Sequence, residues 1–288
     1  MSLLLASLGF GIVTAAVLAI AAVGFTLQFA VTDVLNLAFG AVMVLSAYVA
    51  YALNRAGVTI WIGVLAAAAT GALVSLALNR CVYTPFKRRG TSPIALVIVA
   101  LGMTLILEFG LQAVIGADSV SYQLSQGSGI NAGGLRLSTV QLVIIALAVV
   151  IMAGVHALLR YSRLGKAMRA TAANPSLARN SGIRTDRVVT ITWAISGALC
   201  GTAGAIFAMD AGSFGATSTD LFLILILAAV FLGGPGQAYG AMLGAAVIGI
   251  STEVGAAYIT PAYKDVIAFV LLLGMLALRP TGLLGQRT

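Results

Sequence analysis

The chain has 288 residues, of which 60% are hydrophobic and only 8% are charged, and its mean hydropathy is +1.07. This composition leaves too little polar surface to cover a soluble globule, so we expect an integral membrane protein. The formal net charge is +8, but the excess lies in a few loops beside apolar segments without interleaved aromatic residues, which argues against nucleic-acid binding.

Charge-free apolar segments recur along almost the whole chain, and a helix needs about 20 such residues to cross a bilayer. The first segment lacks the basic flank of a secretory signal, so we expect it to be retained and to span the membrane. In chain order the expected spans are residues 9–32, 35–53, 59–79, 93–115, 137–159, 188–209 and 266–278.

One further apolar stretch, residues 221–252, is too long for one ordinary span and too short for two full ones. We expect two half-helices in a hairpin, because a helix does not continue through a group of glycines and a proline. The interrupting residues are Gly233, Gly234, Pro235, Gly236 and Gln237.

A polar interruption near residues 30–40 predicts a second broken or re-entrant helix, in the first half of the chain. Its residues are Thr32, Asp33, Asn36 and Gly40. Broken apolar segments in both halves are typical of transport pathways, and polar groups in lipid face a cavity or a partner. Two interpretations of Asp33 stay open: it lines a pathway, or it ends one span in a short turn.

Glu108 lies within the expected span 93–115, on the same helical face as Thr104. A carboxylate at that depth must be paired, protonated or hydrated. It either serves substrate or proton transfer or bonds a neighbouring helix, and the sequence leaves both open.

No residue set for catalysis is present. The glycine-rich run lacks the Gly-Lys-Ser/Thr ending of a phosphate-binding loop, and neither H-E-x-x-H nor G-x-S-x-G occurs. We therefore expect no enzyme, and any ATP must be bound by another chain. Cys81 and Cys200 stand singly and His156 is the only histidine, so we expect no metal site.

A basic loop at residues 160–187 carries seven of the sixteen basic residues. Lys and Arg loops are retained on the cytoplasmic side during insertion, and a second basic cluster at residues 80–89 is expected on the same side. Ser162 is placed to cap one short helix, and Asn174 to cap another with Pro175 at its first position, ending at Gly182. From charge alone, this loop is either a docking surface or a solvated connector.

The residues resemble the permease subunit of branched-chain amino acid type ABC importers, and the resemblance spans nearly the whole chain. Two of the blocks that carry it are SRLGKAMRATAANPSLARNSGIRTDRVVTITWAISGALCGTAGAIF from Ser162, and FLGGPGQAYGAMLGAAVIGI from Phe231 with RPTGLLG from Arg279. The other two are GFTLQFAVTDVLNLAFGAVMVLSAYVAY from Gly24 and VYTPFKRRGTSPIALVIVALGMTLILE from Val82.

The resemblance implies one all-helical permease domain over residues 1–288, with a type II ABC importer-like fold of about eight crossings in a bacterial inner membrane. It implies a second permease, two ATP-binding cassette subunits that hold ATP and Mg, and an outer solute-binding protein. The family's coupling loop maps onto residues 160–187, at Leu164, Gly165, Lys166, Arg169, Ala170, Asn174, Pro175, Ala178 and Gly182.

One departure concerns the cargo. The family's first block usually reads Asn-Phe-Ala-His-Gly followed by an acid, whereas this chain has Phe39 at the histidine position and Ala41 at the acid position. We expect Asn36, Phe39 and the glycine break to border the path. Branched-chain amino acids are the first choice, with other amino acids, urea, short amides and aromatic acids as alternatives. The rival to an ABC permease is an ion-coupled secondary transporter using Asp33 or Glu108.

Overall fold

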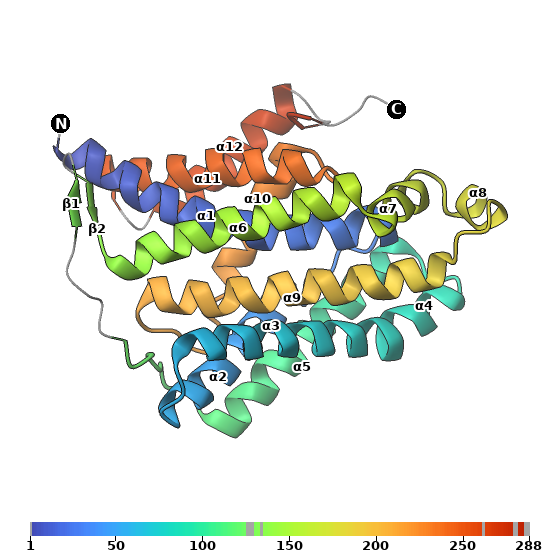
Figure 1. The fold of residues 1–288 in the computed structure, drawn as a ribbon, viewed down its shortest axis with the longest axis horizontal. Coiled ribbons are helices and arrows are strands. Elements are labelled where there is room, and N and C mark those ends of the chain that lie inside the picture. Colours follow the sequence, from blue (N-terminus) through green and yellow to red (C-terminus); the bar gives the residue numbers. More distant parts are fainter. Residues whose placement is uncertain (1, 125–129, 133–134, 261–262, 279–281, 285–288) are drawn as a thin grey trace.

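The computed structural model describes residues 2–124, 130–132, 135–260, 263–278 and 282–284, so residues 279–281 at the start of the RPTGLLG block lie outside the described set. Long helices form one bundle, in which α1, α6, α9 and α11 run roughly alongside one another (Figure 1). The first helices are α1 (Ser2–Thr32), α2 (Phe39–Arg55), α3 (Ile60–Ala77), the π-helix η1 (Leu78–Tyr83), α4 (Thr84–Arg88) and α5 (Pro93–Ile115). The later ones are α6 (Thr139–Tyr161), α7 (Arg163–Ala173), α8 (Pro175–Asn180), α9 (Thr185–Ala211), α10 (Asp220–Gly233), α11 (Ala238–Tyr258) and α12 (Lys264–Leu278).

The predicted helical fold is confirmed, with one small addition. Between α5 and α6, β1 (Ile130–Ala132) and β2 (Leu135–Leu137) form a single antiparallel pair. Six helices of the described chain are long and apolar enough to cross a membrane: Leu4–Thr32, Ile60–Arg88, Pro93–Ile115, Thr139–Tyr161, Thr185–Ala211 and Ala238–Tyr258. α10 and the apolar part of α12 are shorter, so the count of about eight crossings stays a prediction.

Two predicted boundaries were wrong. The third span was expected to end at residue 79, but the helix runs on through η1 and α4 to Arg88, and Gly90 follows with a φ of 71°. The hairpin of two half-helices was also wrong in part. α10 has 14 residues and is about 21 Å long, whereas α11 has 21 residues and is about 31 Å long, enough for a full crossing. α11 continues past residue 252 to Tyr258, and the Glu253 carboxylate on it pairs with Lys264.

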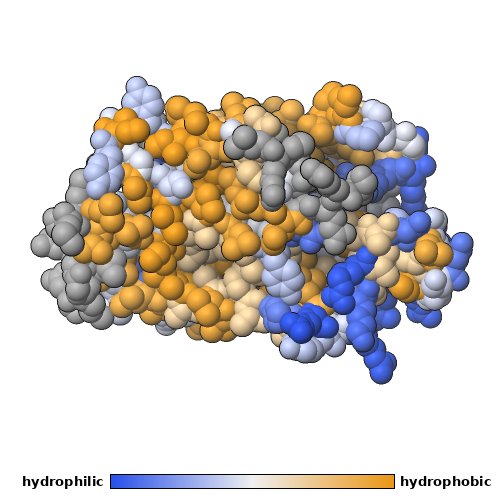
Figure 2. Space-filling model, turned by 90° about the horizontal axis from the view of Figure 1, so that it is seen from above, coloured by the Kyte–Doolittle hydropathy of each residue, from blue (hydrophilic) through white to orange (hydrophobic). Residues whose placement is uncertain are grey.

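The polar residues collect at one end of the bundle. Hydrophobic side chains cover the middle of the molecule, and hydrophilic ones gather where α4, α7 and α8 lie (Figure 2). We call this the basic end, because it carries both basic clusters, residues 80–89 and 160–187, as predicted. The ends of α2, α5, α9 and α11 and the start of α12 lie at the opposite end.

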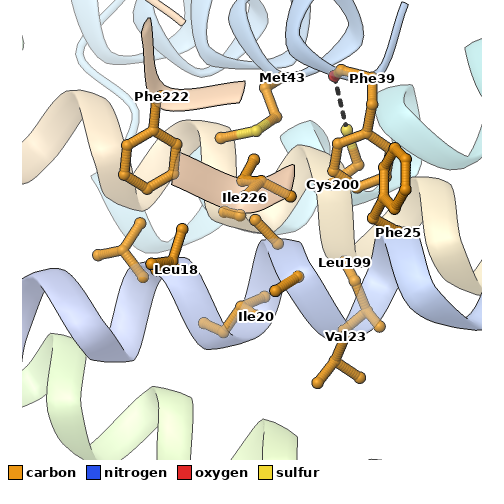
Figure 3. Close-up of a cluster of buried hydrophobic side chains, with 14 of the residues drawn as sticks. Leu18, Ile20, Val23, Phe25, Phe39, Met43, Leu199, Cys200, Phe222 and Ile226 are labelled. Atoms are coloured by element: carbon orange, nitrogen blue, oxygen red, sulfur yellow. Dashed lines mark hydrogen bonds between the residues drawn. The ribbon is translucent and has the colours of Figure 1, made fainter. Parts of the chain in front are cut away.

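The core is built around α9, which is the most enclosed of the candidate spans. In its most apolar window, 72% of residues are buried, against 17% for α5. A side chain at Gly201 would overlap the Ala67 carbonyl of α3, and one at Gly204 would overlap the Met43 carbonyl of α2. Glycines therefore let α9 pack backbone to backbone against its neighbours. Figure 3 shows the adjoining side-chain core between α1, α2, α9 and α10.

Candidate functional site

The basic end carries a capped helix that turns sharply away from the bundle. The backbone N–H of Gly165 donates to Ser162 Oγ at 2.9 Å, which is the predicted N-cap of α7. A side chain at Gly165 would overlap the carbonyl oxygens of Leu158 and Leu159 at the end of α6. Only glycine lets α7 start this close to α6, and the guanidinium of Arg169 donates to the Leu159 carbonyl across the same corner.

α7 lies with one face on the bundle and the other exposed. Met168 and Thr171 are buried, whereas Lys166 and Arg169 are exposed. The helix contacts α1, α6 and α9. Its basic face is therefore exposed, although Arg169 also bonds the Leu159 carbonyl, and its apolar face is fixed to three helices of the bundle.

α8, which follows α7, is also a short helix with a side-chain N-cap. Leu177 N–H donates to Asn174 Oδ1 at 2.9 Å, Pro175 is the first helical residue, and Gly182 follows with a φ of 85°, so the predicted cap and stop are both confirmed. Ala178 is buried, but Leu177 is 62% exposed. The pair α7 and α8 thus presents cations and one large apolar side chain to the exterior of the bundle.

A buried polar cluster surrounds Asn36, in the non-helical stretch between α1 and α2. Asn36 is 1% exposed; its Nδ2 donates to Gln28 Oε1 at 3.4 Å, and its Oδ1 accepts from the Tyr83 hydroxyl at 2.7 Å. Ser196 of α9 donates to the same Gln28 oxygen at 3.3 Å. The Trp193 ring lies 5.1 Å from that of Tyr83, centroid to centroid.

Two groups of this cluster, Gln28 Nε2 and Trp193 Nε1, have no hydrogen-bond partner among the residues that the structure describes. Non-helical backbone at membrane depth occurs where it is buried in protein or lines a cavity, and here Asn36 and its partners enclose it. Tyr83 comes from η1, and π-helical turns are frequent at functional sites. The cluster is therefore a polar contact between the broken segment, α1, the end of the π-helix and α9.

Phe39 and Gly40 lie in the packed core at the start of α2. Phe39 is fully buried against Phe25, with ring centroids 5.5 Å apart, and its carbonyl accepts from the Cys200 thiol at 3.2 Å (Figure 3). The Gly40 carbonyl accepts from the Thr219 hydroxyl at 2.9 Å. Both positions hold the start of α2 against neighbouring helices.

Glu108 faces inward from α5, on a buried stripe with Leu96 and Ala100. Thr104 falls on the same stripe and is half-buried, its hydroxyl donating to the Ala100 carbonyl at 3.0 Å. Glu108 lies beside the Asp220 carboxyl at the start of α10, and within the described part of the chain its Oε1 has no hydrogen-bond partner. Since Asp220 follows Thr219, the structure brings Glu108 and Gly40 together around the start of α10.

Asp33 and the glycine break lie near the basic end, where a side chain at Gly236 would contact Ala30 of α1. Asp33 is exposed and has a φ of 52° directly after α1, the geometry of a turn. In the break, Gly234 and Gly236 have positive φ values, and a side chain at Gly233 would overlap the backbone of Gly240. The break thus closes α10 tightly onto α11.

The predicted pathway residues therefore fall into separate groups. Asn36 is buried beside Tyr83 toward the basic end, Phe39 and Gly40 begin α2 in the core, Glu108 lies at the start of α10, and the break lies at the basic end. The charge pattern did not predict that Gln28, Tyr83 and Ser196 contribute to the Asn36 cluster. Gln28, a glutamine inside the uncharged span 9–32, could have indicated it, because a buried amide needs hydrogen-bond partners.

The comparisons with known proteins bear on the whole chain. Residues 7–276 match the sequence profile of the family described as "Branched-chain amino acid transport system / permease component". The chain belongs to this permease family.

Several curated relatives cover the permease almost completely. It is 30% identical to the high-affinity branched-chain amino acid transport system permease protein LivH of Salmonella typhimurium, over 96% of this chain and 94% of the relative. BraD of Pseudomonas aeruginosa gives the same identity and coverage. The galactofuranose transporter permease protein YtfT of Escherichia coli is 27% identical, over 91% of this chain and 76% of that protein. All are named as permeases and none as an enzyme.

A solved structure supports the fold of the permease. The chain superposes on PsaBC from Streptococcus pneumoniae in complex with Fab with a TM-score of 0.51 and 14% identity, covering 93% of this chain and 90% of that one. Together with the family match, this makes the permease a multi-span membrane protein and a transport subunit, not an enzyme.

In its described part, no group of three His, Cys, Asp or Glu side chains is arranged to hold a metal ion.

Proposed function

We propose that this permease is the membrane-spanning subunit of an ATP-driven importer that moves branched-chain or related amino acids across a bacterial-type inner membrane. The observation that carries the proposal is the family match over residues 7–276, with relatives named for branched-chain amino acid transport at 30% identity. The relatives also include permeases named for galactofuranose and fructose, so the class of substrate needs its own test.

In this proposal the permease works with a second permease subunit, identical or different, two ATP-binding cassette subunits and an outer solute-binding protein. ATP and Mg would be held by the cassette subunits. The basic loops 80–89 and 160–187 would face the cytoplasm, since Lys and Arg loops are retained there.

The loop 160–187 is proposed as the coupling element within a single permease domain. Leu164 and the exposed α7 cations would contact one cassette subunit, and α8 beside them would add Leu177, while buried Gly165 sets the corner between α6 and α7. Support comes from the exposed basic face of α7 and from the caps that keep both short helices folded outside the bundle. Closure of the cassette subunits would bias the bundle between outward-open and inward-open states, as a bistable change without covalent catalysis.

The pathway would be bordered by Asn36, Phe39 and the break at Gly233, Gly234 and Gly236. The buried cluster around Asn36 supports this, because an unpartnered amide nitrogen on Gln28 keeps hydrogen-bonding capacity that another state can use. Asp33, Gly40, Thr104 and Glu108 complete the proposed set, at the turn after α1 and around the start of α10.

The test is uptake by the assembled complex in vesicles, with ATP hydrolysis measured in parallel. Lys166→Glu and Leu177→Glu change exposed side chains of α7 and α8, so insertion and abundance should be unchanged. In both variants we expect ATP hydrolysis to continue without driving leucine uptake. The matched control is Arg88→Glu, which reverses an exposed charge at the same end but outside the loop, and it should transport normally.

Two results would contradict the proposal. One is full coupling in both loop variants at normal abundance. The other is leucine import that survives ATP depletion and collapses with the ion gradient, which would favour an ion-coupled transporter. Competition of leucine uptake by isoleucine, urea, acetamide and benzoate separates the substrate classes in the same vesicles.

A further inference from the structure

A cavity of about 400 Å³ opens at the end of the bundle opposite the basic end. Residues of α1, α6, α9, α10, α11 and α12 line it. Its volume falls within the range of roughly 300–1,000 Å³ that is typical of small-molecule sites. None of the pathway candidates discussed above contributes to its wall.

The mouth of the cavity carries charges of both signs. Lys264 Nζ donates to Glu253 Oε1 at 2.6 Å, and the Thr14 hydroxyl donates to the same oxygen at 2.9 Å. Asp210 lies within electrostatic reach of both Glu253 and Lys264. Asp210 is exposed to the cavity, whereas the Glu253 side chain is only 16% exposed. The mouth therefore offers one accessible anion beside one accessible cation.

The accessible carboxylate is held in place by a neighbouring helix. Gln141 Nε2 donates to Asp210 Oδ1 at 3.3 Å. Gln141 is itself fixed, because its Oε1 accepts from the Ser138 backbone N–H at 3.1 Å in the capping box of α6. The cap of α6 thus fixes the Gln141 amide, and the amide in turn fixes the Asp210 carboxylate. The carboxylate is therefore already oriented before a ligand binds.

The floor of the cavity is apolar. Val17 lies about one helical turn deeper along α1 than Thr14, and Leu225 lies about one turn deeper along α10 than Leu221. The rings of Phe207 and Phe222, with centroids 4.8 Å apart, form part of the wall. A ligand with an aliphatic end and an end that carries one positive and one negative charge would match the apolar floor and the charged mouth.

We propose that this cavity binds a free zwitterionic amino acid with an aliphatic side chain. The ligand ammonium would bond Asp210, its carboxylate would bond Lys264, and its side chain would pack toward Val17 and Leu225. The proposal extends the proposed function by giving the substrate a site on this chain, and it rests on that function for the class of ligand.

The first experiment uses the full-length wild-type chain in phosphatidylcholine nanodiscs with radiolabelled leucine. Two competitors each lack one charge of leucine: 4-methylpentanoate has no ammonium, and 3-methylbutylamine has no carboxylate. Hydrogen bonds to charged groups contribute enough that each competitor should bind roughly tenfold or more weakly than leucine. This comparison needs no variant, so it does not depend on whether a variant folds.

The second experiment measures leucine binding by Asp210→Asn and Lys264→Met. We expect roughly 10- to 100-fold weaker binding in each. Asp118→Asn is the control, because Asp118 is an exposed acid at the same end that does not line the cavity, and its leucine affinity should be unchanged.

Three results would overturn the proposal: equal competition by leucine and both analogues, unchanged leucine affinity in both folded cavity variants, or no leucine binding while phosphatidylethanolamine copurifies and is lost from the variants. The last result would mean that the same charges bind a lipid headgroup.

The binding and transport measurements together also distinguish the cavity proposal from the proposed function. Leucine binding without ATP-driven import would refute the proposed function alone, and normal import without the charge-dependent binding pattern would refute the cavity alone.

Discussion

At the scale of single residues, two buried tyrosines differ in what their hydroxyls do. Tyr83 donates to Asn36 Oδ1 at 2.7 Å, whereas no described residue forms a hydrogen bond with the Tyr48 hydroxyl. We predict that Tyr83→Phe lowers stability by about 1–3 kcal/mol, because a buried acceptor loses its donor. Thermal unfolding of the purified permease in detergent measures the change.

Tyr48→Phe is the matched control for that prediction, since it deletes an unpaired hydroxyl from a side chain that is equally enclosed. It should leave the midpoint unchanged or raise it. Equal losses in the two variants would show that the Asn36 cluster contributes no specific hydrogen bond.

Residue types with local partners could be predicted from sequence, and those with distant partners could not. Ser162 and Asn174 cap helices through N–H groups three residues ahead, so their spacing alone indicated the bonds. The partner of Asn36 is 47 residues away and that of Gln28 on α9 is 168 residues away. Such pairs depend on how helices pack, which periodicity does not specify.

At the scale of elements, α7 depends on its cap because it is short. Isolated helices of this length are marginal, so packing and caps keep them folded. We predict that Ser162→Ala costs about 1 kcal/mol locally and speeds amide hydrogen exchange across α7. Mass spectrometry of peptides from Arg163–Ala173 measures this.

Ser181→Ala supplies the comparison, because Ser181 is exposed and no side-chain hydrogen bond is seen for it among the described residues. Its exchange should match that of the wild type. Unchanged protection of α7 in Ser162→Ala would mean that packing against α1, α6 and α9 suffices without the cap.

Breaks between elements were easier to predict than the lengths of the helices around them. Glycine and proline at 233–236 stop a helix for local steric reasons, and the structure has the break there. The apolar stretch was bounded at residue 252, but α11 continues to Tyr258, and the Glu253 carboxylate pairs with Lys264, eleven residues on.

At the scale of the whole molecule, the two ends of the bundle differ in charge, which predicts how the chain inserts. Arg179 lies at the basic end and Asp118 at the opposite end, and both are exposed. In a Cys81→Ser, Cys200→Ala background, a membrane-impermeant maleimide should label Asp118→Cys in intact spheroplasts. It should label Arg179→Cys only after permeabilisation, because basic loops stay in the cytoplasm.

The reverse labelling pattern would place α7 and α8 outside the cell and remove the basis for docking cassette subunits there. Labelling of both sites only after lysis would point to a different path for the loop that contains Asp118.

Sequence motifs indicated the family, which the profile match confirmed, whereas the cavity at the opposite end was not predicted. Its walls come from six helices, and no local pattern shows that they meet.

The unbroken course of α9 has a mechanical consequence. The helix begins at Thr185, with four residues between it and the end of α8, and it ends just after Asp210; over 27 residues it is about 40 Å long. Its helical structure is continuous from Thr185 to Ala211, and its glycines pack closely against α2 and α3. A tilt of about 10° imposed at Thr185 would therefore shift the far tip by about 7 Å, and whatever turns the one end turns the other with it.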